Sequence, residues 1–161
     1  MSTAAPAASP VSVDYVNPVI QATIDVFRKM LNCKAWRVDL QLKQSTKPLH
    51  ELSAIIGVSG KATGTYVLSL SKQVSLEILR RMVGIEASEI DADVCDAAGE
   101  ILNMIAGQAK AKLQKLELSI SLPSMITGKD HDIRYPSDVR PICVLFDSEI
   151  GPYAIEVGFS S

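Results

Sequence analysis

The sequence predicts an α+β fold, in which a mostly antiparallel sheet of about six strands carries three helices, one of them long. Three observations support this fold. The chain has 161 residues, the size of one domain. Its strand-like stretches are joined by short turns, which favour antiparallel pairing. Helical periodicity appears in three separate segments. Residues 1–12, rich in Ala, Pro and Ser, are predicted to form a flexible tail, and residues 13–161 one domain.

Composition and charge exclude several classes of function. With 47% hydrophobic and 21% charged residues, the chain has enough apolar side chains to form a core. The net charge of −2 argues against nucleic acid as the main partner, because phosphates require a basic surface. No apolar stretch is long enough for a membrane helix, and the N-terminus does not resemble a signal peptide. Cys33, Cys95 and Cys143 form no CxxC pair, so neither a zinc knuckle nor a disulfide scaffold is indicated, and we expect reduced thiols in a cytoplasmic protein.

The first predicted helix begins at Asn17 and Pro18, a capping side chain followed by the residue best tolerated at the first helical position. It ends near Cys33. The next segment, 36–43, alternates apolar and polar side chains, which predicts a strand with one buried face. Its apolar members are Trp36, Val38, Leu40 and Leu42.

A hairpin and a second helix follow. Residues 52–58 and 63–70 are predicted strands joined by a turn at 59–61. Ser71 is placed to cap the second helix, and Gly84 to end it.

A long third helix is predicted from Glu89 to Leu116. Ser88 and Asp91 at its start have the spacing of a capping box, with Asp in place of the usual Glu. Three strand-like stretches close the chain, at residues 118–127, 140–146 and 153–159. The last alternates aromatic and aliphatic residues with small or polar ones.

One face of this long helix carries a narrow polar stripe, opposite an apolar face. Most such stripes are only solvated surfaces, but three details favour a function. Asn103 is a poor helix former placed in mid-helix, and Glu100 is its neighbour three residues away. Gly107 costs the helix about 1 kcal/mol relative to Ala, and it would let another surface approach closely. The stripe comprises Asp93, Asp96, Glu100, Asn103, Gly107, Lys110 and Gln114.

Other motifs are weaker. Gly57, Gly60 and Gly64 do not have the spacing of a phosphate-binding loop and suit a hairpin turn. The aspartates at the start of the long helix lack the glycine and glutamate of a calcium loop. No nucleophile motif of Ser, Cys and His is present.

The polar stripe contains the signature of a known family. Asp or Ser, three residues, Glu, two residues and Asn occur here as Asp96, Glu100 and Asn103. The flanking segments VNPVIQATIDVFRKML, IIGVSGKATGTYVLSLS, GEILNMIAGQAKAKL and SLPSMITGKDH agree as well. The chain thus resembles the CheX branch of the CheC/CheX/FliY chemotaxis phosphatases from Val13 to Phe159. CheC-type members carry two copies of the helix motif, whereas this chain has one.

The resemblance implies an enzyme that hydrolyses the aspartyl phosphate of a response-regulator receiver domain such as CheY. Asn103 would orient the attacking water, and Glu100 would pair with the active-site lysine of the receiver. Asp96, Gly107 and Lys110 would belong to the receiver-binding surface. The receiver would supply Mg²⁺, so this chain would need no metal or other cofactor of its own, and no covalent enzyme intermediate is expected.

The resemblance also implies a homodimer formed by joining two sheets. Pro123 is the candidate for the downstream proline of the family, with no active role assigned. The target receiver and modulation by a CheD-like protein are left open.

An alternative is a non-catalytic module. Flagellar-switch proteins share a similar fold, and such a protein could bind a receiver without hydrolysing its phosphate. The combination of Glu100 with Asn103 favours activity, since a purely structural helix has little need of a mid-helix Asn beside a Gly.

Overall fold

A computed structural model describes residues 13–160, so the predicted tail at 1–12 lies outside the described residues. The described chain forms three α-helices and a seven-stranded sheet, which confirms the predicted α+β class. The helices are α1 Val13–Leu31, α2 Lys72–Val83 and α3 Ala92–Ala111, and a 3₁₀ turn, η1, spans Gln114–Leu116. The strands are β1 Ala35–Leu42, β2 Leu52–Ser59, β3 Thr63–Leu70, β4 Ser119–Ile120, β5 Ser124–Thr127, β6 Ile142–Ser148 and β7 Tyr153–Ser160.

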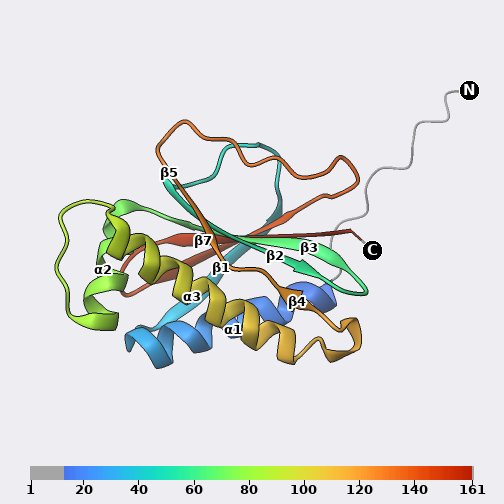
Figure 1. Cartoon of the computed structure of the whole chain (residues 1–161), viewed down its shortest axis with the longest axis horizontal. Coiled ribbons are helices and arrows are strands. Elements are labelled where there is room, and N and C mark those ends of the chain that lie inside the picture. The colour runs from blue at the N-terminus through green and yellow to red at the C-terminus, as the bar shows by residue number, and fades with distance from the viewer. Residues whose placement is uncertain (1–12, 161) are drawn as a thin grey trace, which may run out of the picture.

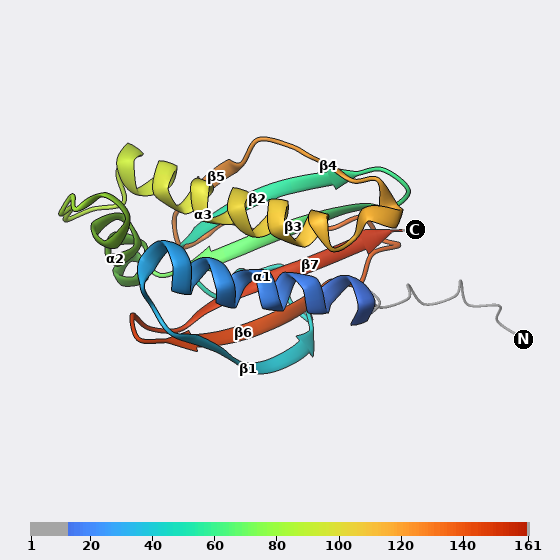
Figure 2. The same cartoon turned by 90° about the horizontal axis from the view of Figure 1, so that it is seen from below.

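The sheet is antiparallel throughout, in the order β1-β6-β7-β3-β2-β4, and β5 also pairs with β2. Helices α1 and α3 lie side by side across one face, with α2 at one end (Figures 1 and 2). Loops 43–51 and 128–141 cover the other face (Figure 1). These loops are joined to each other, since the Ile133 amide donates to the Thr46 carbonyl at 2.7 Å.

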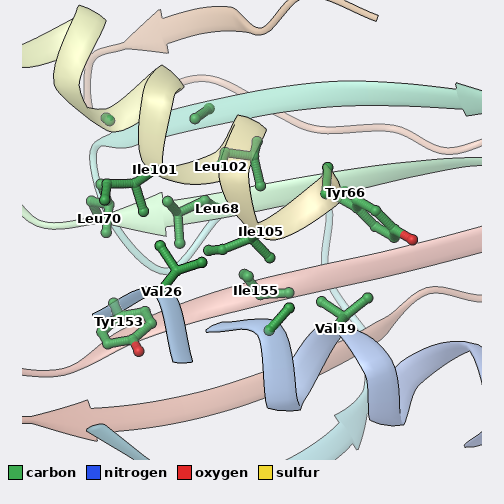
Figure 3. Close-up of a cluster of buried hydrophobic side chains, with 14 of the residues drawn as sticks. Val19, Val26, Tyr66, Leu68, Leu70, Ile101, Leu102, Ile105, Tyr153 and Ile155 are labelled. Atoms are coloured by element: carbon green, nitrogen blue, oxygen red, sulfur yellow. The ribbon is translucent and has the colours of Figure 1, made fainter. Parts of the chain in front are cut away.

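The core lies between the helices and the sheet (Figure 3). Helix α3 contributes Ile101, Leu102 and Ile105, each with no exposed surface. Helix α1 contributes Phe27, which stacks on Tyr153 of β7 with ring centroids 4.4 Å apart. Burying such side chains stabilises the fold by about 1.5–3 kcal/mol each, so α3 is held rigidly along its apolar face.

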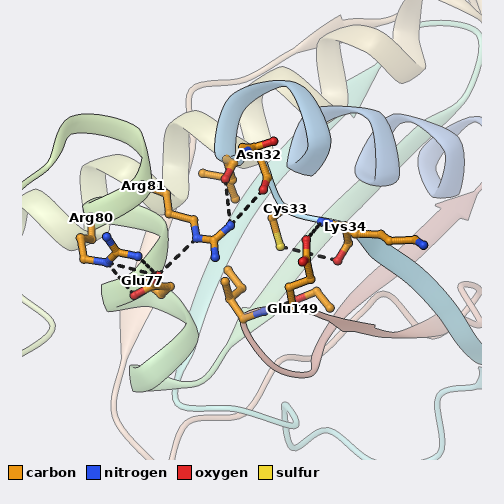
Figure 4. A network of polar contacts seen from close by, with 10 residues as sticks. Asn32, Cys33, Lys34, Glu77, Arg80, Arg81 and Glu149 are labelled. Atoms are coloured by element: carbon orange, nitrogen blue, oxygen red, sulfur yellow. Dashed lines mark hydrogen bonds and ion pairs between the residues drawn. The ribbon is translucent and has the colours of Figure 1, made fainter.

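Polar contacts fasten the end of α1 to its neighbours (Figure 4). Arg81 of α2 donates from Nη1 to the carbonyls of Leu31, at 3.2 Å, and Asn32, at 3.0 Å. Glu149, in the β6–β7 turn, accepts from the Lys34 amide at 2.6 Å. The bonds from Arg81 satisfy carbonyl groups that the end of a helix leaves without partners, and the Glu149 carboxylate satisfies the Lys34 amide.

The predicted caps of α2 are confirmed. Ser71 Oγ accepts from the Val74 amide at 3.1 Å. Gly84 ends the helix with φ of 73°, a conformation that favours glycine, and its amide donates to the Arg80 carbonyl at 2.8 Å.

The predicted start of α1 is wrong, because the helix already includes Val13, and Pro18 lies inside it. Proline in a helix removes one backbone hydrogen bond. Here the packing of Val16 and Val19, both buried in the core, outweighs that loss.

The predicted buried face of β1 holds for only half of the strand. Leu40 and Leu42 pack against the core, but Trp36 is 44% and Val38 59% exposed. A register shift between Arg37 and Asp39 explains the difference. The extra residue of a β-bulge reverses the alternation, so the two halves of the strand do not share one buried face.

The boundaries of α3 also differ from the prediction. Asp91, not Ser88, is the N-cap, and its Oδ1 accepts from the Val94 amide at 3.0 Å. The helix ends at Ala111, where the Lys112 amide bonds to the carbonyls of Ala109 and Lys110. The separate turn η1 follows, in place of the predicted continuation to residue 116.

The last strands differ from the predicted ones because of the residues and loops around them. The predicted strand 118–127 is two short strands, β4 and β5, interrupted at 121–123 around Pro123, which has no amide proton for a ladder bond. Strand β7 is buried on both faces, including Glu156 at 1% exposure, because loops cover the side away from the helices.

Candidate functional site on helix α3

The polar stripe predicted from the sequence lies on the surface of α3 that faces away from the core. Asp96, Glu100 and Lys110 are exposed, and Asn103 and Gly107 are half-buried. Helix α3 runs between α1 on one side and the β4–β5 segment on the other (Figure 2). All five predicted site residues therefore share one accessible face of a single helix.

Glu100 and Asn103 are available to a partner. Among residues 13–160, neither side chain has a hydrogen-bond or ion-pair partner within the chain. Their spacing of three residues makes them neighbours on the helix surface. The stripe thus presents a carboxylate, which can pair with a cation, beside an amide, which can both donate to and accept from a water molecule.

Gly107, one turn beyond Asn103, is not required by the packing of this chain. A Cβ atom built on it would have no heavy atom within 4 Å. Its φ is not positive, so the backbone does not demand glycine either. The open space above Gly107 is consistent with the close approach of another molecule.

Gly99 has the opposite character, and it is not among the site residues predicted from the sequence. A Cβ atom there would lie 3.2 Å from Cγ of Pro123 and 3.5 Å from Sδ of Met125. The absence of a side chain therefore lets the segment between β4 and β5 pack on α3, one turn before Asn103. Only a glycine directly before Glu100 hinted at this contact, and residue spacing alone could not name its partner.

On the other side of α3, Asp25 of α1 holds the two helices together. Its Oδ2 accepts from Gln108 Nε2 at 2.9 Å, and its Oδ1 accepts from Gln21 Nε2 at 3.1 Å. Partial burial of Asp25 opposes ionisation, but these amide hydrogen bonds and the charge of Arg28 hold its pKa below the ordinary value. The stripe is thereby carried on a helix braced from both sides.

Two features are absent from the described residues. Between residues 13 and 160, no three side chains of His, Cys, Asp or Glu gather as they would around a metal ion. In the same range, no helix has the length and apolar character needed to cross a membrane.

Comparisons with known proteins identify the family. The family model described as chemotaxis phosphatase CheX matches residues 52–147, which include the whole stripe, Gly99 and Pro123. CheY-P phosphatase CheX of Thermotoga maritima is 27% identical over 122 residues, covering 74% of this chain and 79% of that protein.

Solved structures agree. A CheC-like superfamily protein from Shewanella sp. PV-4 has a TM-score of 0.85 and 29% identity, covering 94% of this chain and all of that one. The CheX–CheY–BeF₃–Mg²⁺ complex from Borrelia burgdorferi gives a TM-score of 0.79 at 20% identity, covering 93% and 100%, and shows the same fold. The chain therefore belongs to the CheX family of chemotaxis phosphatases.

Proposed function

We propose that this chain is a phosphatase that hydrolyses the aspartyl phosphate of a CheY-like receiver domain and so ends a chemotaxis or related two-component signal. One observation carries the proposal. Glu100 and Asn103 stand three residues apart on the accessible stripe of α3, without partners among the described residues, inside the segment matched by the family model. The Thermotoga relative at 27% identity is named a CheY-P phosphatase, which supports the same activity.

Asn103 is the proposed catalytic residue. Its amide enters the active site of the receiver and orients a water molecule in line with the phosphorus. The water oxygen then attacks phosphorus, the bond from phosphorus to the aspartate oxygen breaks, and inorganic phosphate and a free carboxylate result. Phosphoryl transfer relies mainly on positioning and charge stabilisation, both of which a side chain on a rigid helix can supply.

Glu100 holds the receiver in place. Its carboxylate pairs with the active-site lysine of the receiver, and Asp96, Gly107 and Lys110 form the surrounding contact surface. The receiver contributes the Mg²⁺ that neutralises charge on the phosphoryl group. The Borrelia CheX forms a complex with CheY, BeF₃ and Mg²⁺, which is the kind of assembly proposed.

Phosphate release from a Mg²⁺-loaded, phosphorylated CheY-type receiver tests this function. Wild type, at substoichiometric amounts, should turn over many receivers. Asn103→Ala should leave only the background decay while still binding the receiver. Glu100→Ala should weaken binding and turnover together. Asn17→Ala, an exposed Asn on α1, is the matched control and should behave as wild type.

Two results would contradict the proposal. Full activity in Asn103→Ala would show that Asn103 is not the catalytic residue. Binding of the receiver by wild type with no acceleration of phosphate release would identify the non-catalytic alternative instead.

We also propose a cytoplasmic homodimer. The three cysteines are free thiols, as expected in a reducing compartment. Strand β1 lies at one edge of the sheet, where β6 is its sole partner among the described residues, and it exposes Trp36 and Val38. An apolar, unpaired edge is a template for a second strand, so a second copy pairing there would join the two sheets.

A further inference from the structure

Leu122 is the most exposed large apolar side chain among the described residues. It is 87% exposed, whereas the next, Val13, is 61% exposed. Single exposed apolar residues are common and carry no meaning by themselves. The position of Leu122 and the way in which its backbone is held distinguish it.

The backbone on the N-terminal side of Leu122 is fixed by Ser121. The Ser121 amide donates to the Gly57 carbonyl at 2.8 Å, and Ser121 Oγ accepts from the Gly57 amide at 2.9 Å. The same hydroxyl donates to the Leu122 carbonyl at 3.0 Å. Three hydrogen bonds thus hold a turn that exposes an apolar side chain.

The strand pairing makes this turn a bulge. Ile120 pairs with Val58, and Ser124 pairs with Ile55. Three residues, 121–123, therefore face only two on β2, residues 56 and 57. An extra residue of this kind re-aims a side chain, and bulges are common beside active sites.

The bulge also lies beside the proposed catalytic residue. Pro123 packs on the bare backbone of Gly99, with 3.2 Å between its Cγ and the Cβ position of that glycine. Gly99 is one helical turn before Asn103, on adjoining surface of α3. The β4–β5 segment runs alongside α3 in Figure 2. Leu122, the residue before Pro123, is thus held close to the turn of α3 that precedes Asn103.

We propose that Leu122 is an apolar anchor for the receiver domain, contacting an apolar patch next to the phosphorylated aspartate. The inference rests on the proposed function and adds a residue outside the helix signature. A receiver that places its phosphoryl group against Asn103 must also cover the neighbouring bulge. Because the bulge is already ordered, docking there costs little conformational entropy, and burial of the leucine contributes to affinity.

Leu49 provides a matched control. It is also an exposed leucine, at 54%, and it lies in loop 43–51 on the opposite face of the sheet (Figure 1). Leu122→Ala and Leu49→Ala thus remove the same atoms from exposed positions. Both should leave the thermal unfolding midpoint unchanged within about 2 °C, because exposed side chains contribute little to stability.

The experiment measures two quantities with a CheY-type receiver. Kd is measured with the receiver loaded with BeF₃ and Mg²⁺, and KM and kcat are measured with the phosphorylated receiver. Leu122→Ala should raise Kd and KM about tenfold and leave kcat at saturation within about twofold of wild type. Leu122→Met, which keeps the apolar bulk, should restore most of the affinity. Leu49→Ala should match wild type.

The outcomes separate the two proposals. If Leu122→Ala has the same Kd, KM and turnover as wild type, the proposed anchor role of Leu122 is overturned and the phosphatase function is left intact. A loss of kcat alone in Leu122→Ala also overturns the anchor, since it would show a role in the chemical step. If wild type neither binds the receiver nor accelerates phosphate release, both proposals are overturned.

Discussion

Lys43 Nζ and Glu156 Oε2 lie 2.5 Å apart and form a buried ion pair on the face of the sheet opposite the helices. The two side chains are only 9% and 1% exposed. Glu156 Oε1 also accepts from the Tyr135 hydroxyl at 3.0 Å, and Lys43 donates to the Lys47 carbonyl at 2.8 Å. One carboxylate on the central strand β7 thereby joins both covering loops to the sheet.

Lys43→Ala should lower the free energy of unfolding by roughly 3–5 kcal/mol, because it leaves the Glu156 carboxylate buried without its cation. Urea denaturation measures this loss. The double variant Lys43→Met with Glu156→Leu should recover part of the stability, since an apolar pair of similar volume avoids the buried charge but leaves the Tyr135 hydroxyl without its acceptor. Phosphatase activity of the folded fraction should be unchanged, because the ion pair lies on the other side of the sheet from α3. Equal destabilisation in the single and double variants would contradict this account.

Tyr135→Phe should destabilise the protein, whereas Tyr66→Phe should not. The Tyr135 hydroxyl donates to Glu156, so its removal should cost about 1–3 kcal/mol. The Tyr66 hydroxyl is buried and has no hydrogen-bond partner among the described residues, so its removal should be neutral or stabilising by up to about 1 kcal/mol. Guanidinium unfolding of both variants tests the contrast, and a clear loss in Tyr66→Phe would reveal a partner for that hydroxyl.

Stability should fall at alkaline pH. Burial raises the pKa of Tyr66 to about 12, above the ordinary value of 10.0. The pKa of Tyr66 is higher in the folded state than in the unfolded state. The contribution of the protonated Tyr66 to the free energy of unfolding is therefore complete below pH 10 and is lost as the pH rises toward 12. The loss from Tyr66 amounts to about 3 kcal/mol at the end of this window. Urea unfolding at pH 8, 10 and 11.5 should show it, and Tyr66→Phe should show a smaller decline over the same range.

Gly107→Ala should raise the free energy of unfolding by about 1 kcal/mol, the full difference in helix propensity. Gly99→Ala should gain less or lose stability, because its new methyl group would meet Pro123 at 3.2 Å. Differential scanning calorimetry of the two variants provides the comparison. An equal gain at both positions would show that Pro123 moves away without cost.

A larger side chain at the same open position should impair function without unfolding the protein. The Cβ atom of Gly107→Leu would meet no heavy atom of this chain within 4 Å, but the side chain should lower kcat/KM toward a phosphorylated receiver by about tenfold to a hundredfold, by displacing the docked partner. Its melting temperature, measured in parallel, serves as the control for folding. Unchanged kinetics would remove Gly107 from the proposed contact surface.

Val38→Lys should weaken the proposed homodimer at least about tenfold, because a lysine on an edge strand opposes strand addition. Light scattering after size-exclusion chromatography measures the mass as a function of concentration. Leu49→Lys, at a similarly exposed site in a loop, should leave the mass unchanged. A wild-type protein that remains monomeric at all concentrations would contradict the proposal.

Much of the fold follows from local signals in the chain. Ser71 and Gly84 bound α2 where predicted, since a cap depends on a few adjacent residues. The hairpin of β2 and β3 likewise requires only two periodic strands and a turn between them. The polar stripe of α3 follows from helical geometry alone, so Glu100 and Asn103 lie together as expected. The catalytic and binding roles of these residues remain predictions.

Other features depend on residues distant in sequence. Pro18 is accommodated inside α1 because Val16 and Val19 are buried, which periodicity after residue 18 could not reveal. The strand predicted at 118–127 divides in two because it follows β2 through a bulge. These are cases in which tertiary packing overrides a local preference.

The sequence by itself determined the α+β class, most of the elements and the helix that presents Glu100 and Asn103, because periodicity and caps are properties of neighbouring residues. Only the tertiary structure decided what surrounds that helix. The contact of Pro123 with Gly99, the exposure of Leu122 beside it and the burial of Glu156 under two loops join segments separated by more than twenty residues. Such contacts form only when the chain folds in space, and neither the periodicity of the sequence nor a capping residue predicts them.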